Sequence, residues 1–149
     1  MVKRVIYPPI WLLFGLVAII LCYTYLPGPR FNGWAGQVAG VLLIVLGLVL
    51  LVIAAGLFAR AKTDLIPFRN VSALVTTGIY RYTRNPMYLG MVAILLGSAV
   101  ASGASTALLV PPLFAVIIEM RFIRPEEAML RDLFPAQYPA YCERVRRWL

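Results

Sequence analysis

Long apolar runs alternate with short polar segments along most of the chain. The first run, residues 8–29, reads "PPIWLLFGLVAIILCYTYLPGP", and the second, residues 34–59, reads "WAGQVAGVLLIVLGLVLLVIAAGLFA". Neither contains a charged residue. Because an α-helix needs about 20 apolar residues to cross the hydrocarbon of a bilayer, both runs predict transmembrane helices.

A third apolar run covers residues 88–118 and is also free of charge. It is too long for one membrane helix, and "ASGAS" at 101–105 predicts a turn near its middle. Each half is then short for a full crossing, so the run predicts a tight helical hairpin, with Pro111 and Pro112 kinking its second arm. The expected fold is therefore all-α and integral to the membrane. It has about four transmembrane helices, of which the last two form a hairpin, and a C-terminal helical segment follows.

Basic residues are concentrated in the polar segments 60–87 and 119–149 and at Lys3 and Arg4, whereas the 27–33 loop has one arginine and the 101–106 turn has none. Cytoplasmic loops carry such an excess of Lys and Arg. We therefore expect both termini in the cytoplasm and the protein in a bacterial-type inner membrane.

Composition supports this assignment. The chain is 62% hydrophobic and 13% charged, against about 25% charged residues in soluble domains. Its 149 residues allow a single domain, with two N-terminal spans in residues 1–59 and a motif loop, hairpin and C-terminal segment in residues 60–149. Although the net charge is +8, the basic residues are scattered between apolar runs, so nucleic-acid binding is not expected.

Histidine is absent, and the two cysteines, Cys22 and Cys142, lie in an apolar run and a basic tail. This excludes imidazole as a general base and argues against a disulfide framework and a zinc or haem site. We expect no metal.

The stretch "GIYRYTRNPMYLG", residues 78–90, has two interpretations. Arginine and tyrosine anchor helices at membrane interfaces, and Asn85-Pro86 is a typical helix start. Alternatively, this stretch and the carboxylates Glu126 and Glu127 line one polar pocket at the membrane surface. The simpler interpretation of the two glutamates is a solvated first helical turn that favours the helix dipole.

"LVTTGIYRYTRNPMYLG", followed about 35 residues later by "RPEEAMLRDLFPAQYPAYCERVRRW", closely resembles the isoprenylcysteine carboxyl methyltransferase family, whose wider relatives include membrane phospholipid N-methyltransferases. The resemblance covers roughly the C-terminal half. Three positions depart from the family pattern: Asn85 replaces a common histidine, Ile79 a common proline and Pro135 a usual glycine. A mechanism that needs a histidine base at position 85 is therefore excluded.

The resemblance implies an S-adenosylmethionine-dependent methyltransferase acting on a lipophilic acceptor, either isoprenylcysteine-carboxylate-like or phospholipid-like. Its partners would be membrane lipids and this acceptor. No catalytic residue is assigned. Substrate-orienting candidates are Arg144, Arg146 and Arg147. The residues implied to bind the cofactor are Tyr80, Arg84, Asn85, Pro86, Tyr88, Leu89, Glu126, Glu127, Tyr138 and Tyr141.

Two other functions fit the same pattern. Membrane sterol reductases look similar in their C-terminal half and bind NADPH, although this chain is much shorter than they are. A non-catalytic membrane partner that retains the fold is the other alternative, and Asn85 and the other departures favour it. The sequence does not distinguish O- from N-methylation, and it leaves the acceptor and the oligomeric state open.

Overall fold

The computed structural model describes residues 7–31, 33–60 and 74–149. Lys3 and Arg4 lie outside the described residues, as do Lys62, Asp64 and Arg69 of the basic loop. Within the described residues every regular element is helical, which confirms the all-α prediction. The α-helices are α1 (Pro8–Tyr25), α2 (Trp34–Arg60), α3 (Pro86–Ser102), α4 (Val110–Ile118), α5 (Arg124–Leu133) and α6 (Gln137–Arg144), and three short elements are η1 (Gly78–Arg81), η2 (Ser105–Leu109) and η3 (Glu119–Ile123).

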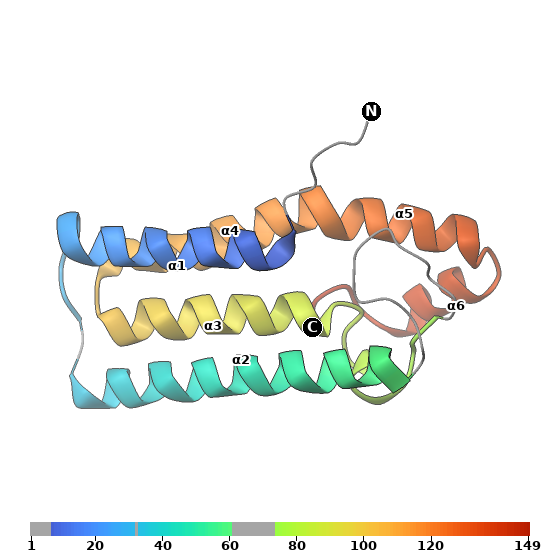
Figure 1. Ribbon diagram of the computed structural model, residues 1–149, viewed down its shortest axis with the longest axis horizontal. Coiled ribbons are helices and arrows are strands. Elements are labelled where there is room, and N and C mark those ends of the chain that lie inside the picture. Colours follow the sequence, from blue (N-terminus) through green and yellow to red (C-terminus); the bar gives the residue numbers. More distant parts are fainter. Residues whose placement is uncertain (1–6, 32, 61–73) are drawn as a thin grey trace.

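Four helical segments form an elongated bundle in which α3 runs between the others (Figure 1). The two predicted N-terminal helices are confirmed as α1 and α2. Three segments of the described chain are long and apolar enough to cross a membrane: Pro8–Tyr25, Trp34–Arg60 and Ser105–Leu133. The fourth, α3, has 17 residues and is shorter.

The predicted hairpin is present, and its turn lies where the sequence placed it. Helix α3 ends at Ser102, and Gly103 adopts a left-handed conformation with φ of 68°, which glycine accommodates without strain. Pro111 and Pro112 lie in the first turn of α4, where η2 passes into the α-helix. Proline is tolerated there because the first helical N–H groups have no intrahelical partner.

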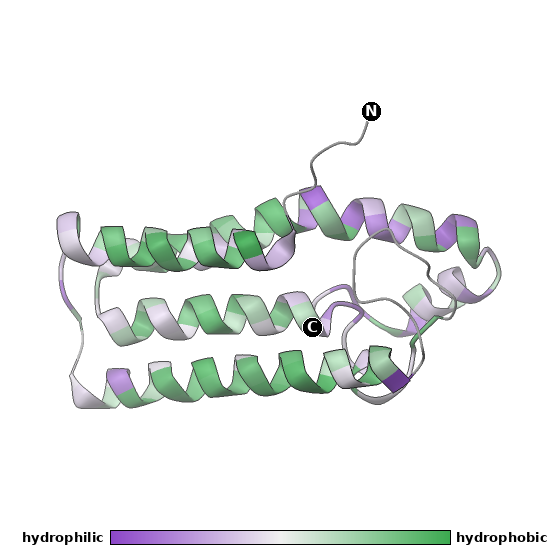
Figure 2. Cartoon of the chain, in the orientation of Figure 1, coloured by the Kyte–Doolittle hydropathy of each residue, from purple (hydrophilic) through white to green (hydrophobic). Residues whose placement is uncertain are grey.

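The second arm does not stop at the predicted polar boundary. After α4 the chain continues through η3, a single π-helical stretch, directly into α5, so that Ser105–Leu133 forms one continuous rod. Figure 2 shows the consequence: the bundle is mostly apolar along its length, and hydrophilic residues gather where α5 and α6 extend beyond it.

Four glycines bring α2 and α3 into close contact. Gly40 lies against Gly97 and Gly47 against Gly90, and a Cβ built on any one of them would lie 2.5–2.8 Å from the carbonyl oxygen of its partner. The spacing of seven residues on each helix repeats the contact along one face. By contrast, Gly33, just before α2, and Gly56, within it, have nothing within 4 Å of such a Cβ.

Candidate functional site at the polar end of the bundle

The turn that leads into α3 is held by α6. Tyr80 in η1 is buried and its ring packs on Phe58 of α2, with centroids 5.6 Å apart. The Tyr141 hydroxyl donates a hydrogen bond of 2.6 Å to the backbone oxygen of Tyr80. The ring of Tyr138, also buried, lies tilted against the ring of Tyr141, with their centroids 6.2 Å apart. These three predicted site tyrosines therefore lie together, in the packing beneath the turn.

Burial keeps these phenols protonated. It raises the pKa of Tyr141 to about 12, with the nearby Arg84 guanidinium opposing the rise, and it raises the pKa of Tyr80 and Tyr138 still further. The pKa of Tyr141 in the folded protein lies above the ordinary value of about 10. The protonated Tyr141 phenol therefore contributes its full stabilisation of the fold below pH 10, and this stabilisation is lost as the pH rises through the pKa of the folded state.

We expect Tyr141→Phe to lower the free energy of unfolding by about 1–2 kcal/mol, because the buried Tyr80 carbonyl would lose its side-chain donor. Thermal unfolding of the detergent-solubilised protein would measure this. Tyr82→Phe is the matched control, since Tyr82 lies in the same motif and is 75% exposed. Equal melting temperatures for the two variants would contradict the assigned role of the hydrogen bond.

The C-terminal segment lies directly along the turn before α3. The Arg84 N–H donates to the Arg146 carbonyl at 3.0 Å, and the Asn85 side-chain amide donates to the Arg147 carbonyl at 2.9 Å. The buried Thr83 hydroxyl donates to the same Arg147 carbonyl at 3.2 Å. The predicted helix start at Pro86 is confirmed, but the Asn85 side chain does not cap it; it binds the C-terminal backbone instead.

Glu127 is the centre of a buried ion cluster. Its side chain is only 5% exposed, and it receives a bidentate pair from Arg147, at 3.0 Å from Nε and 2.8 Å from Nη2. Arg84 Nη2 lies 3.2 Å from the same carboxylate, and Arg131 Nη2 lies 4.0 Å away. The solvated first turn that the sequence also allowed is therefore wrong for Glu127. The hydrogen bonds to Glu127 hold the pKa of Arg147 above its ordinary value.

A second carboxylate, Glu119, extends the cluster. It accepts hydrogen bonds from Arg147 Nη1 at 2.9 Å and from the Trp148 indole at 3.1 Å, and Arg124 pairs with it from the exposed side. Sequence reasoning missed Glu119. The available signal was its position as the first charge after a long apolar run, since a carboxylate at the end of a membrane helix is often functional.

The π-helical stretch explains how one arginine reaches both carboxylates. Glu119 and Glu127 are eight residues apart, which in a regular α-helix separates their directions by roughly 80°. A π turn inserts one extra residue, so the effective offset is seven residues and the divergence falls to roughly 20°. Both carboxylates therefore face the C-terminal segment, and Arg147 bridges them.

Glu126 points to a different partner from its neighbour. It is partly buried, and one oxygen accepts a hydrogen bond of 2.7 Å from the Tyr88 hydroxyl on the first turns of α3. Consecutive helical residues diverge by about 100°, which is why Glu126 meets α3 while Glu127 meets the C-terminal segment. Among the described residues, the Tyr88 hydroxyl is the one hydrogen-bond donor to the Glu126 carboxylate, which leaves its second oxygen available.

The remaining predicted residues divide into two groups. Pro86 is buried at the start of α3, and Leu89 is half-buried one turn later. Arg144 and Arg146 are exposed on the tail, the former bonded to the Ala140 carbonyl at 3.2 Å. Arg147, by contrast, is engaged by the two carboxylates.

No group of three or more acidic, histidine or cysteine side chains among the described residues is placed to hold a metal ion.

Comparison with known proteins accords with this geometry. The phospholipid methyltransferase family matches residues 35–137, from the beginning of α2 to the beginning of α6. The chain is 30% identical to protein-S-isoprenylcysteine O-methyltransferase B of Arabidopsis thaliana over 139 residues, which is 90% of this chain and 68% of that protein. It is 29% identical to protein-S-isoprenylcysteine O-methyltransferase A of the same plant, over the same shares.

A shorter relative is an uncharacterized protein of Haemophilus influenzae, 38% identical over 63 residues, which is 42% of this chain and all of that protein. The family match begins in α2, so it extends further toward the N-terminus than the motifs alone indicated. The resemblance inferred from the two motifs is confirmed, and the chain belongs to the phospholipid methyltransferase family.

Proposed function

We propose that this chain is an integral membrane methyltransferase that takes its methyl group from S-adenosylmethionine and delivers it to a lipophilic acceptor. The observation that carries the proposal is the Tyr88–Glu126 pair, 2.7 Å apart, which holds a carboxylate at the boundary between the apolar bundle and the polar cluster. An anionic group at this boundary favours the binding of a cofactor that carries a cationic sulfonium and an ammonium group. A lipophilic acceptor approaches from the apolar side.

The two adjacent glutamates have different tasks in this proposal. Glu127 has both oxygens engaged by guanidinium groups, so it organises the site rather than contacting the cofactor. Glu126 keeps one oxygen for the cofactor's ammonium or ribose hydroxyls. This divides between two residues a role that the resemblance gave to both.

Arg84 supplies the second polar contact. Its Nε is buried and has no hydrogen-bond acceptor among the described residues, although leaving a buried donor unsatisfied costs about 1–3 kcal/mol. The carboxylate of S-adenosylmethionine would satisfy it with a charge-assisted hydrogen bond. Tyr138 and Tyr141 are buried beneath the turn, so in this proposal they hold the turn in place instead of offering their faces to the adenine or, by cation–π attraction, to the sulfonium.

The chain's own contribution to the reaction is positioning. S-adenosylmethionine, when bound, supplies an electrophilic methyl group. A site without histidine suits an acceptor that is already nucleophilic, as an ionised carboxylate or an unprotonated amine is. Alignment of the two reactants can then contribute up to about 7–11 kcal/mol. Exposed Arg144 and Arg146 are the candidates for orienting an acidic acceptor, whereas Arg147 holds Glu127.

The membrane arrangement is part of the same proposal. We place the shorter helix α3 as a fourth span, since it runs alongside the three longer segments (Figure 1). Residues 1–149 then form one domain, with both termini and the polar cluster on the cytoplasmic side of a bacterial-type inner membrane. The arginine excess of the tail supports this orientation.

The test is equilibrium binding of S-adenosylmethionine to the purified, detergent-solubilised chain. We expect saturable binding that weakens roughly tenfold to hundredfold in Glu126→Gln, the loss of one charge-assisted hydrogen bond. Glu143→Gln is the control, because Glu143 is an exposed carboxylate on α6, and it should bind as the unchanged chain does.

Two results would overturn the proposal. Binding of NADPH in place of S-adenosylmethionine would assign the chain to the reductase alternative. A folded sample that binds neither compound would favour the non-catalytic alternative. If S-adenosylmethionine binds equally well to Glu126→Gln, the cofactor assignment stands but the role of Glu126 does not.

A further inference from the structure

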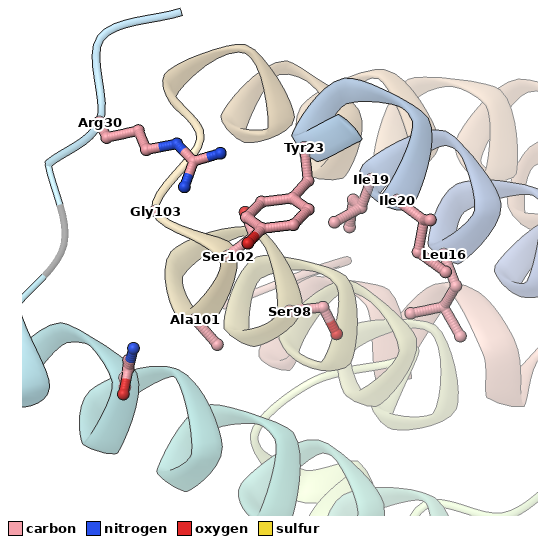
Figure 3. A pocket seen from close by; sticks show the side chains of 10 residues that line it. Leu16, Ile19, Ile20, Tyr23, Arg30, Ser98, Ala101, Ser102 and Gly103 are labelled. Atoms are coloured by element: carbon pink, nitrogen blue, oxygen red, sulfur yellow. The ribbon is translucent and has the colours of Figure 1, made fainter. Parts of the chain in front are cut away.

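A pocket of about 640 Å³ lies between α1, α2 and α3, at the end of the bundle remote from the polar cluster (Figure 3). Its volume is within the range of roughly 300–1,000 Å³ that small-molecule sites occupy. The proposed methyl-transfer site does not use it. Since α3 has 17 residues and rises about 1.5 Å per residue, the two ends are separated by roughly 25 Å.

The pocket exists because α1 and α2 both pack against α3 without extensive contact with each other in the described chain. The glycine pairs draw α2 onto α3, while α1 packs on α3 where Gly15 meets Leu95. The space left between α1 and α2 is floored by α3.

The lining changes from apolar to polar along the helix axis. Leu16, Ile19 and Ile20 of α1 form the deeper wall, while Tyr23, Arg30 and Ser102 lie at the mouth. This order matches a phospholipid, whose acyl chain is apolar and whose headgroup carries a phosphate at the membrane surface.

Arg30 is held over this mouth by its backbone. Residue 30 pairs with Ala104 in an isolated antiparallel bridge, and the Phe31 N–H donates to the Gly103 carbonyl at 3.2 Å. The Arg30 guanidinium lies 4.9 Å from the centre of the Tyr23 ring, a cation–π distance. The side chain that faces the pocket is therefore positioned before a ligand arrives.

Among the residues that the structure describes, no carboxylate forms an ion pair with Arg30. It is the only charged residue between positions 5 and 59, and residues 85–118 contain none. Its counter-ion must therefore come from outside these segments, and a guanidinium is well suited to bind a phosphate in bidentate fashion.

We propose that this pocket binds an anionic phospholipid, with the phosphate on Arg30 and an acyl chain between α1 and α2. The lipid lies in the leaflet opposite the polar cluster. Because its headgroup is roughly 25 Å from that cluster, it is a bound lipid and not the methyl acceptor. The site is independent of the proposed cofactor chemistry.

Native mass spectrometry of the detergent-solubilised chain tests the proposal, with phosphatidylglycerol, phosphatidylcholine and free glycerol phosphate as probes. We expect phosphatidylglycerol to bind about tenfold more tightly than phosphatidylcholine. Arg30→Gln should abolish this preference, and Arg30→Lys should retain part of it because the charge remains. Arg60→Gln is the matched control, an exposed arginine at the other end of α2.

A second variant tests the pocket itself without changing any charge. Ser98 lines the α3 floor, and its hydroxyl donates to the Ile94 carbonyl within the same helix at 2.8 Å. Ser98→Leu therefore fills space while the helix is kept. We expect it to weaken phosphatidylglycerol binding as much as Arg30→Gln does. The proposal is overturned if Ser98→Leu binds normally, if Arg60→Gln and Arg30→Gln lose binding equally, or if glycerol phosphate binds as tightly as the lipid.

Discussion

Replacing Glu127 by glutamine is expected to lower the free energy of unfolding by about 3 kcal/mol, even when no cofactor is present. Removing one partner of a buried ion pair typically costs about 3–5 kcal/mol. The lower end applies here, because the Arg147 side chain is 32% exposed and solvent partly screens it. Arg84, only 11% exposed, would remain largely buried beside a neutral group.

The expected effect is also a matter of hydrogen-bond geometry. Glutamine offers one acceptor oxygen, and its amide nitrogen would face the donors of Arg84 or Arg147. The contacts from the C-terminal segment to the turn before α3 rest on the same cluster. We therefore expect the segment around Arg147 to detach from the turn when Glu127 is replaced.

Thermal unfolding in detergent measures the loss, and about 3 kcal/mol corresponds to a decrease of roughly 10 °C in melting temperature for a chain of this size. Asp132→Asn is the control, since Asp132 is an exposed carboxylate on the same helix. A melting temperature for Glu127→Gln no lower than that of Asp132→Asn would show that the cluster is not structural. Arg84→Met combined with Glu127→Gln should cost less than the two single changes together, because the pair is removed as a unit.

Gly47→Ala is expected to lower the free energy of unfolding by about 2–3 kcal/mol, an unusual result for adding one methyl group to a membrane helix. The new Cβ would lie 2.5 Å from the Gly90 carbonyl oxygen and 2.7 Å from Ile94. The first of these is backbone and cannot rotate away, so α2 must move off α3 along the most extensive helix contact in the fold. Overpacking of this kind costs about 1–3 kcal/mol.

Gly56→Ala is the control for Gly47→Ala, because a Cβ on Gly56 has nothing within 4 Å and both glycines lie in α2. Alanine is favoured over glycine in a helix by about 1 kcal/mol, so this variant should be neutral or slightly stabilised. The opposite signs of the two effects can be read from one set of thermal melts. If Gly47→Ala is as stable as Gly56→Ala, the close approach of α2 and α3 is refuted.

Hydropathy and turn chemistry were sufficient to predict the apolar helices of the bundle and the turn of its hairpin. Charge-free runs gave α1 and α2 to within a few residues, and Gly103 gave the hairpin turn, because both signals depend only on neighbouring residues and on the surrounding lipid. The motif also identified residues that the fold brings together, namely Arg84, Asn85, Tyr88, Glu126 and Glu127.

The partner of each side chain was decided by the tertiary structure alone. One π turn, invisible in the residue pattern, rotates Glu119 toward Glu127 and allows Arg147 to bridge them. The same packing gives two adjacent glutamates different environments. It also places Gly40 and Gly47 in close contact with α3, whereas Gly56 has no such contact. The sequence determines which segments are helical because helix formation depends on neighbouring residues. Contacts between residues 20 to 80 positions apart depend instead on the rotation and the approach of each helix. The rotation and the approach are set only when the whole bundle is assembled.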